Sequence, residues 1–140
     1  MEEMVVKSTK DGMKDVMERL DQVLASRKCR LKENMEFDIA FEELFVNIVH
    51  YAYGDDVGDV RVLYDFSEQM AEYSLEVWLM DKGIPYNPLS KKDPDITKPT
   101  SEREVGGLGI FMAKIYLDFL TYERKNGENC LFLKKSFKAA

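Results

Sequence analysis

The segment FDIAFEELFVNIVHYAY, residues 37–53, decides the fold, because its apolar residues recur at the spacing of an α-helix. At 100° per residue, Glu43, Asn47 and His50 fall together on the side opposite the main apolar cluster. Ile39 and Val46 border this polar stripe, so it differs from an ordinary solvated face. We therefore predict a helix in which Glu43 and Asn47 form the wall of a polar pocket. The apolar cluster comprises Phe37, Phe41, Leu44, Phe45 and Ile48.

The chemistry of this pair suits phosphate transfer. An asparagine carboxamide oxygen can bind Mg²⁺, which prefers hard oxygen ligands. A glutamate one turn earlier can accept a proton from, or orient, a water or hydroxyl that attacks a γ-phosphate. The spacing of Glu43 and Asn47 is common, however, and a partly exposed helix face also explains it. His50 fits a packing or capping role as well as a catalytic one.

Outward from this helix, periodicity predicts the other elements. Alternating residues predict strands, and Asn126-Gly127 predicts a hairpin between the last two. The order β-α-α-β-β-loop-α-β-β favours an α+β fold with a mixed, mostly antiparallel sheet and helices on one face. The expected helices are about 11–29, about 33–52 and 110–117, and the expected strands are 4–8, 60–66, 75–80, 120–124 and 131–135.

A second candidate site follows the strand LEVWLM, where Asp81-Lys82-Gly83-Ile84-Pro85 begins. An acid at the mouth of a buried strand requires a partner. Its carboxylate can accept the exocyclic amino group of adenine, which guanine lacks at that position. Gly83 has no Cβ and lets the backbone approach a flat base. The same triplet also occurs in ordinary turns that end strands.

A third candidate site is the glycine run that precedes the 110–117 helix. In Glu104-Val105-Gly106-Gly107-Leu108-Gly109-Ile110, three of four consecutive residues are glycine. Amide groups at a helix N-terminus bind anions, and glycines free the backbone to wrap around phosphates. The run matches neither GxxxxGK[ST] nor GxGxxG, and a flexible hinge is the alternative interpretation.

The three sites occur in an order that resembles the GHKL ATPase superfamily, which includes gyrase, MutL and histidine-kinase catalytic domains. EELFVNIVHYAYGD resembles its N box, MDKGIPYNP its G1 box, and REVGGLGIFMAKIYLD its G2 box. Within the superfamily, the chain is most similar to stand-alone bacterial anti-sigma factors that are also serine-protein kinases. The resemblance covers about residues 5–136 and implies a two-layer sandwich (the Bergerat fold) as one domain over residues 1–140.

The resemblance also implies a role for each site residue. Glu43 matches the catalytic base, Asn47 the ligand of Mg²⁺, and Asp81 the acid that binds adenine, with Gly83 beside the base. The ATP lid is expected at about 89–105. The residues expected to hold ATP phosphates or to shape the turn around them are Gly106, Gly107, Leu108 and Gly109, together with Arg103 or Lys98 from the lid.

By the same resemblance, the chain uses ATP and Mg²⁺, phosphorylates a serine of a STAS-domain anti-anti-sigma factor, and sequesters a sigma factor. A homodimer is compatible with it, whereas a complete sensor histidine kinase is not expected. The alternative is a non-catalytic, ATP-dependent binding module that regulates another signalling partner, such as a phosphatase or response-regulator circuit. A nucleotide-free structural domain is a further alternative.

Composition narrows the partners and the compartment. The net charge of −6 disfavours sequence-independent nucleic-acid binding, which needs a basic surface. No apolar run approaches the length of a membrane-spanning helix, and the first residues do not form a secretory signal. Cys29 and Cys130 are about a hundred residues apart and are expected to be buried, reduced thiols. We therefore expect a cytoplasmic protein without direct contact to nucleic acid or membrane.

Overall fold

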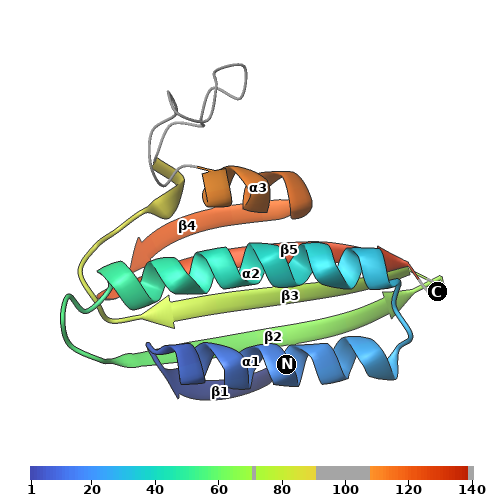
Figure 1. The fold of residues 1–140 in the computed structure, drawn as a ribbon, viewed down its shortest axis with the longest axis horizontal. Coiled ribbons are helices and arrows are strands. Elements are labelled where there is room, and N and C mark those ends of the chain that lie inside the picture. The colour runs from blue at the N-terminus through green and yellow to red at the C-terminus, as the bar shows by residue number, and fades with distance from the viewer. Residues whose placement is uncertain (71, 91–107, 139–140) are drawn as a thin grey trace.

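The computed structural model describes residues 1–70, 72–90 and 108–138, and within them one sheet has five strands (Figure 1). The strand order is β1-β2-β3-β5-β4. Each neighbouring pair in this order is antiparallel, so the described sheet contains no parallel pair and the expected mixed character is absent from it. The strands are β1 (Glu2–Lys7), β2 (Asp59–Gln69), β3 (Glu72–Asp81), β4 (Phe119–Lys125) and β5 (Glu128–Lys138).

Three α-helices of the described chain lie on the same face of this sheet (Figure 1). They are α1 (Lys10–Ser26), α2 (Leu31–Tyr51) and α3 (Leu108–Tyr116). A single turn of 3₁₀ helix, η1, covers Pro88–Ser90. The α+β class and the two-layer arrangement are therefore confirmed. Within the described residues, no helix is both long enough and apolar enough to cross a membrane.

Helix α2 forms the centre of the core, as the sequence predicts. Phe37, Phe41 and Phe45 are almost completely buried, and the centroids of successive rings are 5.9 Å apart. Phe137 from β5 meets Phe37 at 6.0 Å in an edge-on contact. Burying such aromatic side chains contributes about 1.5–3 kcal/mol each, so this ladder fixes α2 against the middle of the sheet.

Local signals set the ends of the elements. Thr9 caps α1, because its hydroxyl accepts a hydrogen bond of 3.0 Å from the Gly12 amide. In the last hairpin, Asn126 and Gly127 have φ angles of 54° and 76°. Positive φ at both central residues is the requirement of a type I′ turn, so the hairpin between β4 and β5 is confirmed.

The two cysteines are unpaired. Cys29 is buried, whereas Cys130 is only half-buried, so the expectation of two buried thiols is correct for one of them. Burial raises the pKa of both thiols, with further contributions from nearby carboxylates. Both groups are therefore held in the neutral, less reactive form.

Candidate functional site

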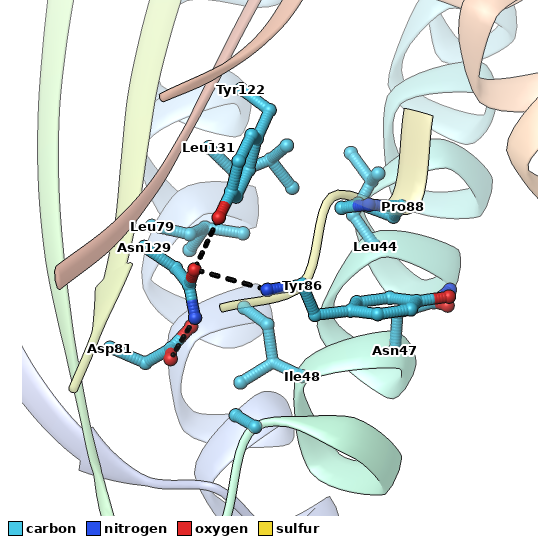
Figure 2. Close-up of a pocket in the computed structure, with 11 residues that line it drawn as sticks. Leu44, Asn47, Ile48, Leu79, Asp81, Tyr86, Pro88, Tyr122, Asn129 and Leu131 are labelled. Atoms are coloured by element: carbon cyan, nitrogen blue, oxygen red, sulfur yellow. Dashed lines mark hydrogen bonds between the residues drawn. The ribbon is translucent and has the colours of Figure 1, made fainter. Parts of the chain in front are cut away.

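Asp81 is the last residue of β3 and its side chain is only 4% exposed. One carboxylate oxygen, Oδ1, accepts a hydrogen bond of 2.9 Å from the Gly83 amide. It accepts a second, also of 2.9 Å, from Nδ2 of Asn129 (Figure 2). The carboxylate therefore has the partners that a buried acid requires. These bonds hold it in one orientation at the wall of the cavity.

Asn129 on β5 is the centre of this network. Its Nδ2 also donates to the Ile84 carbonyl at 2.8 Å, and its Oδ1 accepts from the Tyr122 hydroxyl and, at 3.4 Å, from the Tyr86 amide. Donors and acceptors on both sides fix which end of the carboxamide points to Asp81. Asn129 is 5% exposed, so the network has little contact with solvent.

Gly83 brings the turn after β3 against the end of α2. A Cβ at this position would lie 2.0 Å from the Ala52 carbonyl oxygen. The Ile84 amide donates to that same carbonyl at 2.8 Å, which closes the contact. Because Gly83 has no side chain, its backbone packs directly against the backbone of Ala52. This role is separate from any role beside a bound base.

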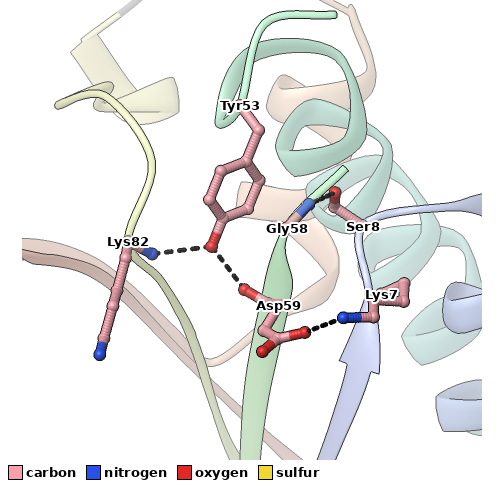
Figure 3. Close-up of polar contacts among 6 residues, drawn as sticks. All are labelled: Lys7, Ser8, Tyr53, Gly58, Asp59 and Lys82. Atoms are coloured by element: carbon pink, nitrogen blue, oxygen red, sulfur yellow. Dashed lines mark hydrogen bonds and ion pairs between the residues drawn. The ribbon is translucent and has the colours of Figure 1, made fainter. Parts of the chain in front are cut away.

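Tyr53 ties the loop after α2 to the same turn (Figure 3). Its hydroxyl donates to the Asp59 carbonyl and accepts a 2.9 Å hydrogen bond from the Lys82 amide. The ring lies where a Cβ of Gly58 would be, 2.3 Å from the nearest ring atom. Burial raises the pKa of the Tyr53 phenol, so it stays protonated and able to donate. Ala52 and Tyr53 therefore support the position of Asp81.

Asn47 lies on the α2 side of the cavity and is 8% exposed. Its Nδ2 donates to the Glu43 carbonyl at 2.7 Å, one turn earlier on the helix. The carboxamide oxygen is thus the end that remains for another ligand. This is the arrangement that a cation ligand needs.

The Glu43 side chain is half-buried and contacts the first turn of α3. A Cβ at Gly109 would lie 2.0 Å from Cδ of Glu43 and 2.2 Å from one of its carboxylate oxygens. The glycine therefore lets the N-terminus of α3 approach the carboxylate. The positive end of the helix dipole favours negative charge there.

The cavity between these groups is narrow. Its volume is about 20 Å³, enough for one or two water molecules. Tyr86 lies across the Asn47 side and stacks on Tyr51 at 4.7 Å, with Pro88 beside it (Figure 2). A purine base is larger than the space enclosed between these side chains.

The structure places the predicted site residues in separate groups. Asn47 and Asp81 line one cavity. Glu43 lies against Gly109 in the first turn of α3, the helix that begins at Leu108. His50 is exposed and its ring lies 6.2 Å from that of Tyr51, which favours the packing interpretation. The remaining predicted positions, Lys98, Arg103, Gly106 and Gly107, lie outside the described residues, as does most of the expected lid at 89–105.

Sequence reasoning missed Asn129, Tyr122 and Tyr86. A signal for Asn129 was present, because β5 alternates and Asn129 is in phase with the buried Leu131 and Leu133. A polar residue at a buried strand position needs partners. Which partners it finds depends on the register of β3 and β5, where Asp81 is paired with Asn129, and a single sequence does not give that register.

The chain is similar to known proteins over most of its length. The histidine kinase-like ATPase domain family matches residues 6–135. Among curated relatives, the serine-protein kinase RsbW of Bacillus cereus (strain AH187) is 30% identical over 103 residues, which cover 71% of this chain and 62% of that protein. RsbW of Bacillus mycoides (strain KBAB4) is 30% identical over 116 residues, covering 79% of this chain and 70% of that protein.

A solved structure supports the fold. The crystal structure of the RsbU and RsbW domains of Rv1364c from Mycobacterium tuberculosis superposes with a TM-score of 0.64 at 13% identity. The match covers the whole of this chain and 34% of that one. The match to the first curated relatives likewise spans less than two thirds of their length.

Proposed function

This chain belongs to the histidine kinase-like (GHKL) ATPase domain family, in the group of the RsbW serine-protein kinases, and we propose that it is an anti-sigma factor with serine-protein kinase activity. Its substrate in this proposal is a serine of a STAS-domain anti-anti-sigma factor. The observation that carries the proposal is the meeting of Glu43 with the N-terminus of α3, one helical turn from Asn47. A general base, a cation ligand and an anion-binding helix end then lie together.

In the proposed reaction, Asp81 binds the adenine amino group and Asn129 holds the carboxylate in place. Glu43 accepts the proton of the serine hydroxyl while the serine oxygen bonds to the γ-phosphorus. The bond between that phosphorus and the bridging oxygen breaks, which leaves ADP and phosphoserine. Glu43 loses its proton to water after the products leave.

Mg²⁺ would neutralise charge on the ATP phosphates. The donor set fits this ion, because the Asn47 carboxamide nitrogen is committed to the Glu43 carbonyl and the oxygen is not. Within residues 1–70, 72–90 and 108–138, no group of three or more His, Cys, Asp or Glu side chains could hold a metal. An ion held by one protein oxygen, phosphate oxygens and water is typical of Mg²⁺. Arg103 or Lys98, Gly106 and Gly107 would complete the phosphate site from the lid.

Phosphotransfer from Mg-ATP to the STAS partner tests the proposal directly. Glu43→Gln keeps the shape of the side chain and removes the base, so transfer should fall by about 10²–10⁴. Calorimetry should show ATP affinity within about threefold of wild type, because the base acts in the chemical step. Glu42→Gln changes the exposed neighbour and is the control. Transfer by Glu43→Gln at the wild-type rate would show that Glu43 is not the base.

The alternative is a non-catalytic module that uses ATP only to switch its affinity for a partner. The same cavity serves both functions. A wild-type chain that binds ATP and changes partner affinity, but never labels the partner with phosphate, would favour this alternative. A pull-down with and without ATP would identify the partner, whether a sigma factor or a component of another signalling circuit.

We further propose a homodimer in the cytoplasm. On the sheet face without helices, Trp78 and Phe132 pack at 5.1 Å, and Val5 and Phe119 are each 57% exposed. Exposed apolar residues on an uncovered sheet face favour association. Unpaired cysteines are typical of a reducing compartment. Sedimentation should give a dimer that Val5→Asp weakens, and a monomer at every concentration would remove the proposal.

A further inference from the structure

A stripe of exposed apolar side chains runs along α2 and leads to Glu43. Leu31, Met35 and Ile39 are 73%, 55% and 48% exposed and follow one another at intervals of four residues. Successive residues at this interval are neighbours on a helix surface, each turned about 40° further around the axis. The next position after Ile39 in the series is Glu43. At 1.5 Å per residue, Ile39 is about 6 Å and Leu31 about 18 Å from Glu43 along the axis.

The stripe forms one side of a shallow groove, and Tyr116 at the end of α3 lies on the other side. The groove is lined by Tyr116 together with the α2 residues Leu31, Lys32, Met35, Glu36 and Ile39. The neighbouring Ile115 on α3 adds a further apolar side chain that is 57% exposed. An apolar surface of this kind, with charged residues at its edge, is typical of a site where another protein binds.

The groove is fixed by a buried lysine. Lys135 on β5 is 6% exposed; its Nζ donates to the Tyr116 carbonyl at 2.6 Å and lies 3.8 Å from the Glu36 carboxylate. The lysine thereby joins the C-terminal end of α3 to α2. Because its sides are already fixed, the groove loses little conformational entropy when a partner binds.

We infer that this groove, here called the α2–α3 groove, docks the protein substrate through an apolar segment next to the acceptor serine. The inference rests on the proposed kinase function, because a serine that reaches Glu43 must bring its surrounding surface over the adjoining stripe. A second copy of the chain covering the same stripe would compete with the substrate for the approach to Glu43. Continuity with the catalytic carboxylate therefore favours the substrate as the occupant.

The chemistry of the groove indicates what it recognises. Besides the Tyr116 ring, its uncharged lining consists of aliphatic and thioether side chains. Met35 can adapt to the shape of an apolar partner. The edge carries one positive and one negative side chain, Lys32 and Glu36. Docking should therefore depend on apolar contact more than on charge, and the KM for the substrate should change little with salt.

The test compares Met35→Glu and Ile39→Glu with Val57→Glu. Val57 is 58% exposed and follows the C-terminal end of α2, far along the chain from Leu31. At saturating ATP, each groove variant should raise the KM for the STAS partner by about tenfold or more, with kcat and ATP affinity within about twofold. Val57→Glu should leave all three unchanged. Glutamate suits an exposed helix position, and thermal unfolding will show that the variants are folded.

Each other outcome has its own meaning. If the wild-type chain transfers no phosphate, the proposed kinase function fails and the docking inference fails with it. If the wild type transfers phosphate and both groove variants keep its KM, only the docking inference is wrong. A groove variant that changes the oligomeric state would assign the groove to a second copy. One that changes ATP affinity without changing KM would assign it to a segment of the same chain. Either result would overturn the inference.

Discussion

The Asp81 end of the candidate site is a closed hydrogen-bond network, whereas the Glu43 end is held by shape alone. Asp81 and Asn129 are 4% and 5% exposed, and side chains and backbone amides of the surrounding elements bond to them. The Glu43 carboxylate is half-buried and, within the part of the chain that the structure describes, has no hydrogen-bonding partner. The difference suits the proposed roles, because a group that binds adenine must be fixed beforehand, while a base must stay available to the proton that it accepts.

Gly83 and Gly109 differ in the same way, because one lies against backbone and the other against a side chain. The missing Cβ of Gly83 accommodates a backbone carbonyl, whereas that of Gly109 accommodates the tip of the Glu43 side chain. Backbone at the end of a helix cannot move aside cheaply, but a glutamate side chain can rotate. The same substitution at the two positions should therefore damage different properties: stability at Gly83 and catalysis at Gly109.

Among the variants that separate the two ends of the site, Gly109→Ala should have the largest effect, on catalysis. The new methyl group would push the Glu43 carboxylate from its place, and misplacement by about 1 Å can cost on the order of 100-fold in rate. The midpoint of thermal unfolding should change little, because only a side-chain tip must move. Single-turnover phosphotransfer with saturating partner measures the rate.

A double variant checks that Gly109 acts through Glu43. Once Glu43→Gln has removed the proposed base, adding Gly109→Ala should have little further effect on the rate. If the fold-losses of the two single variants multiply in the double variant, the methyl group acts on something other than Glu43. The assignment of the Gly109 effect to the Glu43 carboxylate would then be wrong.

The next effect is that of Gly83→Ala on stability. A Cβ 2.0 Å from the Ala52 carbonyl forces the turn and the end of α2 apart, and such overpacking costs about 1–3 kcal/mol. Urea unfolding should show this loss of unfolding free energy. Lys82→Ala, which changes an exposed neighbour, should cost far less. A Gly83→Ala variant as stable as wild type would mean that the turn is not held against α2.

Asn129→Ala should have a smaller effect, on nucleotide affinity. It removes the side chain that orients Asp81, and a hydrogen bond to a charged group contributes about 1.5–3 kcal/mol. ATP should bind at least about tenfold more weakly, and the preference for ATP over GTP should narrow because the carboxylate is no longer fixed. Tyr122→Phe removes one outer hydroxyl and should have a weaker effect. Unchanged affinity and preference in Asn129→Ala would show that Asp81 needs no such support.

The sequence predicted the helices and strands and the positions of the candidate residues on them, for reasons visible in single residues. Glu43 and Asn47 are four positions apart on a strongly periodic helix, and Asp81 directly follows an alternating strand, so local pattern placed all three. Asn129 was missed because its role depends on the pairing of β3 with β5. The contact of Gly109 with Glu43 was missed because it depends on how α3 packs beside α2. Local periodicity encodes neither relation.

The smallest expected effect is that of Asp38→Asn on stability. Asp38 lies on α2, as Glu43 does, but faces Asp21 on α1. Burial raises its pKa to about 7, helped by a hydrogen bond with Asp21 and by the charges of Asp21 and Glu42. In the unfolded chain the pKa is near 3.9. The folded state therefore binds this proton more tightly, and the resulting stabilisation is complete below about pH 4 and is lost as the pH rises through 7.

Asp38→Asn removes a carboxylate that, once charged at high pH, is repelled by the carboxylates of Asp21 and Glu42. The thermal midpoint should rise by on the order of a few degrees at pH 8 and by less at pH 5, where Asp38 is protonated. ATP affinity and phosphotransfer should not change at either pH, because Asp38 does not line the cavity. A change in either would mean that the two ends of the site are coupled through the N-terminal half of α2. The differences at Gly83 and Gly109 could then no longer be assigned to local contacts.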